Sequence, residues 1–352
     1  MIFLFFGKEL VKKAIKMGEI NYDEFTANFA VVGVGGCGSN QVNRIYNNGI
    51  RSAETIAVNT DAKHLSITNA HKKLLIGKDI TRGMGAGGYP EVALKAAQSS
   101  ASAIKEAIKG YDMVFITAGM GGGTGGGAAP VIAEMAKEQG SLVVAFVTYP
   151  FGLERSRKAK ANWSIEQLTK NTDTTIIIEN DRLLSYYSNL PMEKAFEVVD
   201  NITANAVRGI TDTIKFPSLI NLDFADVRSI MSNSGSAVIN IGVGSGNDRI
   251  EHAIKSTISH PLMGYDIEGA SRALIHVSGG SNLTIKEATR LGEGVTESLG
   301  EKSNVIFGAR LEPEANDRVY VMSIVTGVTP RLGEVKLYKE EKAQMDYNVE
   351  SI

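Results

Sequence analysis

The sequence is poor in several features that would assign it to a special class of protein. Cys37 is its one cysteine, which excludes an internal disulfide framework and fits a reducing compartment. Its 37 basic and 39 acidic side chains leave a net charge of −2, so no overall basic field favours a nucleic acid as partner. No run approaches the roughly 18 apolar residues that a membrane-spanning helix needs. Hydrophobic residues still make up 43% of the 352 positions, enough for folded domains, and the length suggests about two of them.

The first 28 residues differ in pattern from the rest. An apolar tip at residues 2–6 precedes a group of lysines, which reverses the order of a secretory signal peptide, and no small-residue cleavage site follows. We expect this segment either to form a helix packed on the next domain or to lie with its tip in an anionic membrane surface. Both alternatives stay open here.

From residue 29, short β-branched runs alternate with helical segments, which is typical of a parallel sheet covered by helices on both faces. Strands are expected at 29–34, 55–58, 73–76, 113–117, 142–148 and 175–178. Helices are expected at 91–109, between Pro90 and Gly110, and at 128–139, before Gly140. The pattern predicts an α/β fold of the Rossmann-like kind over residues 29–190.

A long helix expected at 192–214 changes this rhythm, because apolar residues recur along it at helical spacing. It is long enough to join two domains. A second, smaller α/β region is expected at 216–330. Its helices are expected near 248–257 and 285–299, and its strands near 237–241, 272–277, 304–309 and 319–324. The charged tail 331–352 is expected to be frayed.

Glycine is the residue in excess, with 37 copies that gather at three turns. The turn 33–38 has the spacing GxGxxG after an expected strand, with Asp61 further along. On its own it would support the dinucleotide-binding domain of an NAD-dependent oxidoreductase. A second turn, 119–127, is glycine at seven of nine positions, and a third lies at 83–88.

The turn 119–127 predicts a phosphate-binding loop. Each glycine costs about 0.5–1 kcal/mol relative to alanine, so a ligand is expected to offset the cost. A backbone without Cβ atoms can bring its N–H groups to a polyanion, and a helix expected to begin at Gly127 or Ala128 would direct its positive end there. None of the three turns has the Lys-Ser or Lys-Thr of a Walker A loop, so a P-loop fold is excluded.

Two motifs together resemble the tubulin/FtsZ family of GTPases. The turn 119–127 is similar to the family's signature glycine loop, and residues 221–228, NLDFADVR, are similar to the FtsZ synergy loop almost residue for residue. The resemblance runs from about residue 29 to 328. It implies a GTP-binding domain at 29–190, a central helix at 191–215 and an activation domain at 216–330, with GTP or GDP as ligand.

The same resemblance implies which residues contact the nucleotide. They are Gly36, Cys37, Gly38, Ser39 and Asn40 in a first phosphate loop, Ala86, Gly87 and Gly88 near the γ-phosphate, Gly122, Gly123, Thr124 and Gly125 around the other phosphates, Glu154 and Lys158 in the ribose loop, and Phe196 and Asp200 at the base. Phe196 would stack on guanine, although its spacing equally permits core packing. Asp200 would accept the N1 and N2 hydrogens that guanine has and adenine lacks. Lys158 stands where the family has an arginine, and the neighbouring Arg157 is the alternative.

For hydrolysis, Asn221, Asp223 and Asp226 offer polar groups where a loop enters a helix. Judged from the residues alone, Asp223 as a helix cap and Asp226 in the first turn is the simpler interpretation. The resemblance implies instead that these groups enter the nucleotide pocket of the next subunit in a filament. Asp226 would then polarise the attacking water, with Asp223 and Asn221 supporting the water and Mg²⁺. Asp223 would be the metal ligand, with or without an additional monovalent cation.

The implied function is a GTPase of the cytoplasm that assembles head to tail with itself at the division site, with membrane-tethering division proteins as partners. The last residues lack the family's apolar docking peptide, so tethering is expected elsewhere or at the N-terminal tip.

Gly126 replaces the family's usual Ser or Thr, which removes one hydroxyl expected near the phosphates. This leaves open a divergent paralogue that assembles with little GTP turnover. An NAD-dependent oxidoreductase is the least favoured alternative.

Overall fold

The computed structural model describes residues 27–182, 191–216, 218–220, 222–258, 265–266, 270–297, 299, 303–312 and 315–330. The expectations for the N-terminal tip, for the tail and for Asn221 lie outside these residues.

A mixed sheet runs through the molecule, in the order β10-β9-β11-β7-β6-β5-β4-β1-β2-β3. Six of these strands form the parallel half: β1 (Phe29–Val34), β2 (Glu54–Asn59), β3 (Lys72–Leu75), β4 (Met113–Gly119), β5 (Leu142–Tyr149) and β6 (Thr174–Glu179). The expected strands 29–34, 55–58, 73–76, 113–117, 142–148 and 175–178 are therefore confirmed within one or two residues at each end.

The second half of the sheet contains β7 (Gly235–Gly244), β9 (Arg272–Gly279), β10 (Asn304–Leu311) and β11 (Val319–Thr326). β11 runs antiparallel between β7 and β9, and β10 pairs parallel with β9. Among the described residues, the two halves pair at two positions, Thr174 with Gly235 and Thr175 with Ser236. A separate two-stranded sheet pairs β8 (Tyr265–Asp266) with β12 (Thr329–Pro330).

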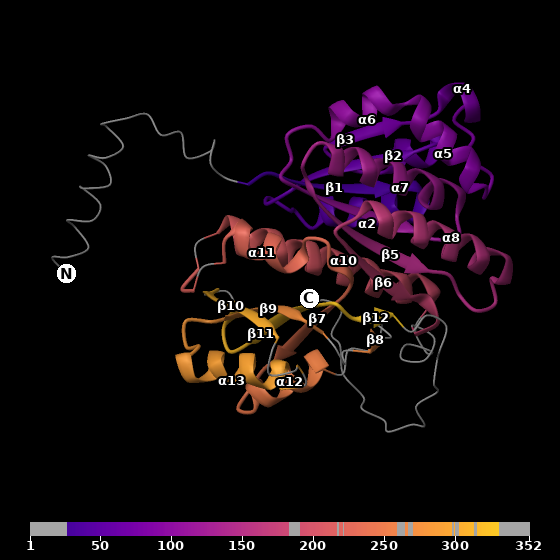
Figure 1. Cartoon of the computed structure of the whole chain (residues 1–352). Helices are drawn as coiled ribbons and strands as arrows, with labels where there is room; N and C mark the ends of the chain where they lie inside the picture. Colours follow the sequence, from indigo (N-terminus) through magenta and orange to yellow (C-terminus); the bar gives the residue numbers. More distant parts are fainter. Residues whose placement is uncertain are drawn as a thin grey trace, which may run out of the picture.

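Helices cover both faces of the parallel half. They are α2 (Gly35–Asn47), α3 (Ala62–Ile67), α4 (Lys78–Thr81), α5 (Pro90–Ser99), α6 (Ala101–Ala107), α7 (Gly123–Glu138) and α8 (Arg155–Asn171). The long α10 (Met192–Lys215) and the short α11 (Phe224–Met231) follow, then α12 (Arg249–Ile258) and α13 (Ile285–Thr296) on the second half. Figure 1 shows α10 and α11 between the two halves of the sheet.

The hydrophobic core has two parts, one on each face of the sheet, because successive side chains of a strand point to opposite faces. Val31 and Val32 are adjacent in β1 and point to opposite faces. Val31 packs in the cluster that includes α10 and the second half of the sheet, and Val32 packs in the cluster that includes α5, α7 and α8. Because β1 is buried on both faces, it is apolar along its length, as a central parallel strand should be.

One segment that was expected to form a single helix forms two helices. The helix predicted at 91–109 breaks at Ser100, between α5 and α6. The Ser100 hydroxyl oxygen accepts a hydrogen bond from the Gly77 N–H at 2.9 Å, and its backbone leaves the helical region at ψ 15°. Serine offers a chain such local alternatives to a helix, which explains the break.

The start of α7 also corrects a prediction. The helix begins at Gly123 and not at Gly127 or Ala128, so most of the supposed glycine loop is helical. These glycines permit close packing of helices: a Cβ at Gly127 would overlap the Pro90 carbonyl oxygen of α5, and a Cβ at Gly126 would overlap the Ser164 Oγ of α8. The free energy that offsets their cost therefore comes partly from helix packing.

Candidate functional site

A cavity of about 1040 Å³ opens where the parallel strands end. Val34 ends β1, Gly119 ends β4 and Asn180 follows β6, and all three line the cavity. In open α/β sheets this edge is where ligands bind.

Two helices begin at this cavity without a side-chain cap. α2 starts at Gly35 and α7 starts at Gly123, and neither has a side chain that accepts from its first N–H groups. The two starts touch, because a Cβ on Gly35 would lie 2.8 Å from the Gly125 nitrogen. Gly35 also has φ +74°, a left-handed conformation that suits glycine. Two positive helix ends with free N–H groups form a site for a polyanion.

The expected phosphate residues divide into those that line the cavity and those that support it. Gly36, Cys37, Asn40, Gly122, Gly123, Thr124 and Gly125 line it. Gly38 and Ser39 belong to the buried face of α2 and do not line the cavity. The Thr124 hydroxyl pairs with that of Thr60 at 2.7 Å, which ties the start of α7 to the end of β2.

The expected γ-phosphate loop, Ala86–Gly88, lies beside the cavity and outside its lining. A Cβ on Gly123 would lie 2.9 Å from the Ala86 Cβ and 3.1 Å from the Gly88 nitrogen. The loop therefore rests on the first residue of α7.

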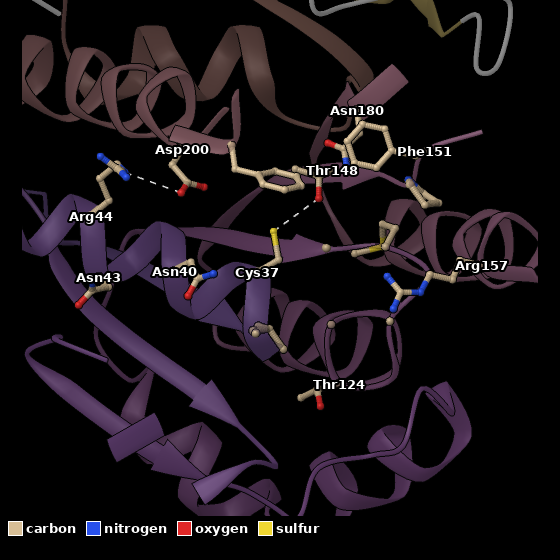
Figure 2. A pocket seen from close by; sticks show the side chains of 18 of the residues that line it. Cys37, Asn40, Asn43, Arg44, Thr124, Thr148, Phe151, Arg157, Asn180 and Asp200 are labelled. Atoms are coloured by element: carbon tan, nitrogen blue, oxygen red, sulfur yellow. Dashed lines mark hydrogen bonds and ion pairs between the residues drawn. The ribbon is translucent and has the colours of Figure 1, made fainter. Parts of the chain in front are cut away.

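The other end of the cavity carries the residues expected at the base. Phe196 is 39% exposed and lines the cavity, where it meets Phe151 edge to face with ring centroids 6.0 Å apart. Core packing, the alternative for Phe196, is thereby excluded. Asp200 lies one turn further along α10 and pairs with Arg44 of α2, 3.7 Å between Oδ2 and Nε (Figure 2).

Burial governs the electrostatics of this end. It raises the pKa of Asp200 to about 6, against the opposing effect of the Arg44 guanidinium and with a smaller contribution from Glu197. Burial likewise raises the pKa of the Cys37 thiol to about 11. The Cys37 Sγ lies 3.5 Å from the Thr148 hydroxyl across the floor of the cavity.

Arg157 and Lys158, the two alternatives for the basic residue of the expected ribose loop, lie differently relative to the cavity. Glu154 lines the cavity, and its Oε1 accepts from the Phe151 N–H at 3.2 Å. Arg157 also lines it and pairs with Glu154 at 2.6 Å. Lys158 is outside the lining and faces Asp181, 3.7 Å away. Of the two, Arg157 is therefore the residue that reaches the cavity.

Sequence reasoning missed the polar face of α2. Asn43, Arg44 and Asn47 line the cavity together with Asn40. Their spacing of three, four and seven residues places them on one side of a helix, so helical periodicity could have found them.

Two further positions with expected roles, Asp61 and Gly126, lie outside the lining of the cavity. Asp61 would bind ribose in a dinucleotide site, but it caps α3, its Oδ1 accepting from the His64 N–H at 3.0 Å, and it does not line the cavity. Gly126 also lies outside the lining, and a Cβ there would face Ser164. A side chain at position 126 would therefore face α8 and not the cavity.

The acids predicted for catalysis form a capping box. Asp226 N–H donates to the Asp223 Oδ1 at 2.8 Å, and Asp223 N–H donates to the Asp226 Oδ2 at 3.1 Å. The simpler interpretation from the residues alone, a cap with an acid in the first turn, is thus correct as geometry. Each carboxylate keeps one oxygen free of these two bonds, and Asp223 is exposed.

These acids lie at the opposite edge of the sheet from the cavity. Phe224, next to Asp223, contacts Phe29, the first residue of β1, whereas Val34, the last, lines the cavity. Arg228 of the same helix donates to the Gly140 carbonyl, just before β5, at 3.4 Å. The length of β1 alone is roughly 17 Å. A copy of this chain cannot bring its Asp223 and Asp226 to its own cavity.

Comparison with known proteins identifies the family. Residues 28–188 match the model of the Tubulin/FtsZ family GTPase domain, and residues 235–329 match that of the FtsZ family C-terminal domain. This chain belongs to the tubulin/FtsZ family. It is therefore a GTPase with a tubulin/FtsZ-like α/β fold, and GTP and GDP are its ligands.

Individual relatives agree with the family models. The chain is 51% identical over 327 residues to Cell division protein FtsZ 2 of Methanocaldococcus jannaschii, covering 91% of this chain and 86% of the relative. It is 48% identical to Cell division protein FtsZ 1 of Pyrococcus horikoshii, over 88% of this chain and 83% of the relative. A solved FtsZ dimer of M. jannaschii superposes with a TM-score of 0.82 at 42% identity, covering 91% and 92% of the two chains.

Within the described part of the chain, no helix combines the length and the apolar character needed to cross a membrane.

Proposed function

We propose that this GTPase assembles head to tail with itself in cell division, and that hydrolysis takes place only where two copies meet. The separation of Asp223 and Asp226 from the cavity of the same chain carries this proposal. Such a contact joins two different surfaces and leaves one of each free, so it propagates into a filament. The names of the relatives support the role in cell division, and the dimer described for one of them supports self-assembly.

Binding would use the two ends of the cavity differently. Phosphates would accept hydrogen bonds from the free N–H groups at the starts of α2 and α7. Guanine would stack on Phe196 and donate its N1 and N2 hydrogens to Asp200, held by Arg44. Glu154 would accept from a ribose hydroxyl. These assignments are proposals that rest on the lining of the cavity.

Hydrolysis would then use the acids of the next copy. Asp226 would accept a hydrogen bond from a water and orient it for in-line attack on the γ-phosphorus, with the bond to the GDP oxygen breaking. Its second oxygen is held by the Asp223 N–H, which fixes the carboxylate.

Mg²⁺ would neutralise charge on the phosphates. Among the described residues, no three His, Cys, Asp or Glu side chains group closely enough to hold a metal ion by themselves. A cation would thus share a free oxygen of Asp223 with phosphate oxygens, as Mg²⁺ commonly does.

Mixing two defective variants tests the proposal. Asp226→Asn keeps the cavity and can still accept the Asp223 N–H, but it loses the carboxylate. Asp200→Ala keeps the acids and loses the guanine contact. Each alone should release little phosphate, whereas the mixture should turn over GTP, because an Asp226→Asn cavity can meet an Asp200→Ala acid edge. The controls are each variant alone at the total concentration of the mixture. A mixture no faster than the sum of its parts would refute the shared site.

We further propose that membrane attachment uses either tethering division proteins or the apolar tip at residues 2–6. Removing residues 1–17 and measuring sedimentation with anionic liposomes separates the two. Reduced binding indicates the tip, and undiminished binding excludes it. The division of the chain into units at 29–190, 191–215 and 216–330 also remains a proposal.

A further inference from the structure

Lys160 of α8 holds the loop beside the cavity. Its Nζ donates to the Gly88 carbonyl oxygen at 2.6 Å and lies 5.0 Å from the centroid of the Tyr89 ring. A short hydrogen bond from an ammonium group to a carbonyl is among the stronger ones a protein makes. One side chain thus fixes both the last glycine of the loop and the residue that follows it.

Among the described residues, Lys160 forms no ion pair with a carboxylate. Elsewhere on α8, Arg157 pairs with Glu154, Lys158 with Asp181 and Lys170 with Glu166. No acidic side chain of the described residues comes within ion-pair distance of Lys160. Its positive charge therefore remains uncompensated beside a loop that adjoins the phosphate end of the cavity.

The loop itself has free donors. Gly87 and Gly88 have φ +60° and +79°, and the turn closes through the Tyr89 N–H, which donates to the Ala86 carbonyl at 3.0 Å. Among the described residues no acceptor takes the Gly87 or Gly88 N–H. The Gly88 nitrogen lies against Gly123, the first residue of α7, which lines the cavity.

These contacts form a continuous connection from Lys160 to Gly88 and on to Gly123. A loop with two successive left-handed glycines has many accessible conformations, and its order must come from outside contacts. Lys160 supplies one such contact to its backbone.

We propose that Lys160 is a positioning residue that gives this site its preference for a nucleoside triphosphate over a diphosphate. It orders residues 86–88 with their free N–H groups available to the terminal phosphate, and its charge favours the added negative charge there. The inference rests on the proposed placement of the γ-phosphate at this loop.

The test measures two affinities for each variant. Lys160→Met keeps the stem over Tyr89 and removes the ammonium, Lys160→Arg restores a cationic donor, and Lys170→Met is the control on the same helix. Affinities for GDP and for a GTP analogue with a methylene between the β- and γ-phosphates are measured by calorimetry, below the concentration at which the protein assembles. Loss of one charged hydrogen bond should reduce the preference for the analogue over GDP about tenfold in Lys160→Met. The preference should be largely restored in Lys160→Arg and unchanged in Lys170→Met.

Two outcomes would overturn the proposal. The first is an unchanged ratio of the two affinities in Lys160→Met, whether or not both affinities fall, and the second is a loss of preference that accompanies a lower melting temperature and is not restored by arginine. Failure of the proposed placement of the nucleotide has a different signature, because the Asp200→Ala variant would then bind the analogue with the same affinity as the wild-type chain. The two failures can therefore be told apart in one series of titrations.

Discussion

Phe224 and Phe29 pack together with ring centroids 6.0 Å apart, and this contact fixes the acidic residues at the edge of the sheet where its strands begin. Phe224 is the first residue of α11 and follows Asp223 directly, while Phe29 is the first residue of β1. The same strand ends at the cavity. The polarity of a parallel sheet thus separates the two parts of the proposed site within each copy.

Phe224→Leu should lower turnover and leave binding intact. The change removes an aromatic pair worth about 1 kcal/mol and loosens the start of α11 where the acids lie. We expect phosphate release per molecule to fall roughly tenfold, because small misplacements of catalytic groups are costly. The GTP dissociation constant should not change, since the cavity lies at the other edge. Phe307→Leu, another partly buried aromatic of the same core cluster, is the matched control. An equal loss of turnover in both variants would contradict the argument.

GTP binding should weaken as the pH falls through about 6. Burial raises the pKa of Asp200 to about 6, and the guanine hydrogens need the ionised carboxylate as acceptor. Protons and guanine therefore compete for one group, and affinity should decline up to about tenfold per pH unit below that pKa. Titrations between pH 5 and 8 check this, with Asp200→Asn as the control that should be weak and independent of pH. A flat profile for the wild-type chain would exclude Asp200 as the base reader.

Asp200 should also cost stability in the nucleotide-free protein. A carboxylate whose folded pKa lies above its ordinary value favours the folded state only when protonated, so stability falls as the pH rises from about 4 to above 6. The penalty at neutral pH is on the order of 2–3 kcal/mol. Asp200→Asn should therefore raise the free energy of unfolding at pH 7.5 and make little difference at pH 3.5. Urea unfolding at the two pH values checks the sign, and a variant less stable at pH 7.5 would contradict it.

The sequence predicts the strands of this fold better than its helices. Strands such as β1 and β5 are buried on both faces and read as continuous apolar runs. By contrast, α8 is polar along most of its length and buries mainly Ala161, Ile165 and Leu168, so its periodicity is weak and no helix was predicted there. The break at Ser100 depends on a bond to Gly77, more than twenty residues away, which no local pattern contains.

The sequence motifs predicted which segments form the site, but not how each side chain within them is directed. The glycine turns at 33–38 and 119–127 lie at the cavity, as their motifs predict, whereas Phe196 was placed there by the family resemblance. The choice of Arg157 over Lys158 depends on the direction of each side chain from α8. The start of α7 was expected too late in the chain, because a run of glycines predicts a loop. In this fold the glycines at 126 and 127 lie within the helix and allow Ser164 and Pro90 to pack closely against it.

Position 126 should tolerate no larger side chain while Ser164 is present. A Cβ there would overlap the Ser164 Oγ, which is buried and has no hydrogen-bond partner among the described residues. Gly126→Ala should destabilise the protein by about 1–3 kcal/mol, and Ser164→Ala should be nearly neutral. The double variant should recover most of the loss in a thermal unfolding cycle. Gly126→Thr should likewise give no faster turnover. Additive effects of the two alanine changes would mean that the residues do not touch.

Cys37 should react slowly despite lining an open cavity. Burial raises the pKa of its thiol to about 11, so little thiolate exists at pH 8, and the thiolate is the reactive form. Alkylation by iodoacetamide should be roughly tenfold or more slower than that of N-acetylcysteine, and the rate should keep rising above pH 9. Bound GTP should slow it further, since the phosphates would occupy the space in front of Sγ. Because the chain has one cysteine, mass spectrometry reads the reaction directly, and urea-unfolded protein gives the unprotected rate. A folded protein that reacts as fast as the unfolded chain, or a rate that GTP does not change, would remove Cys37 from the phosphate end of the cavity.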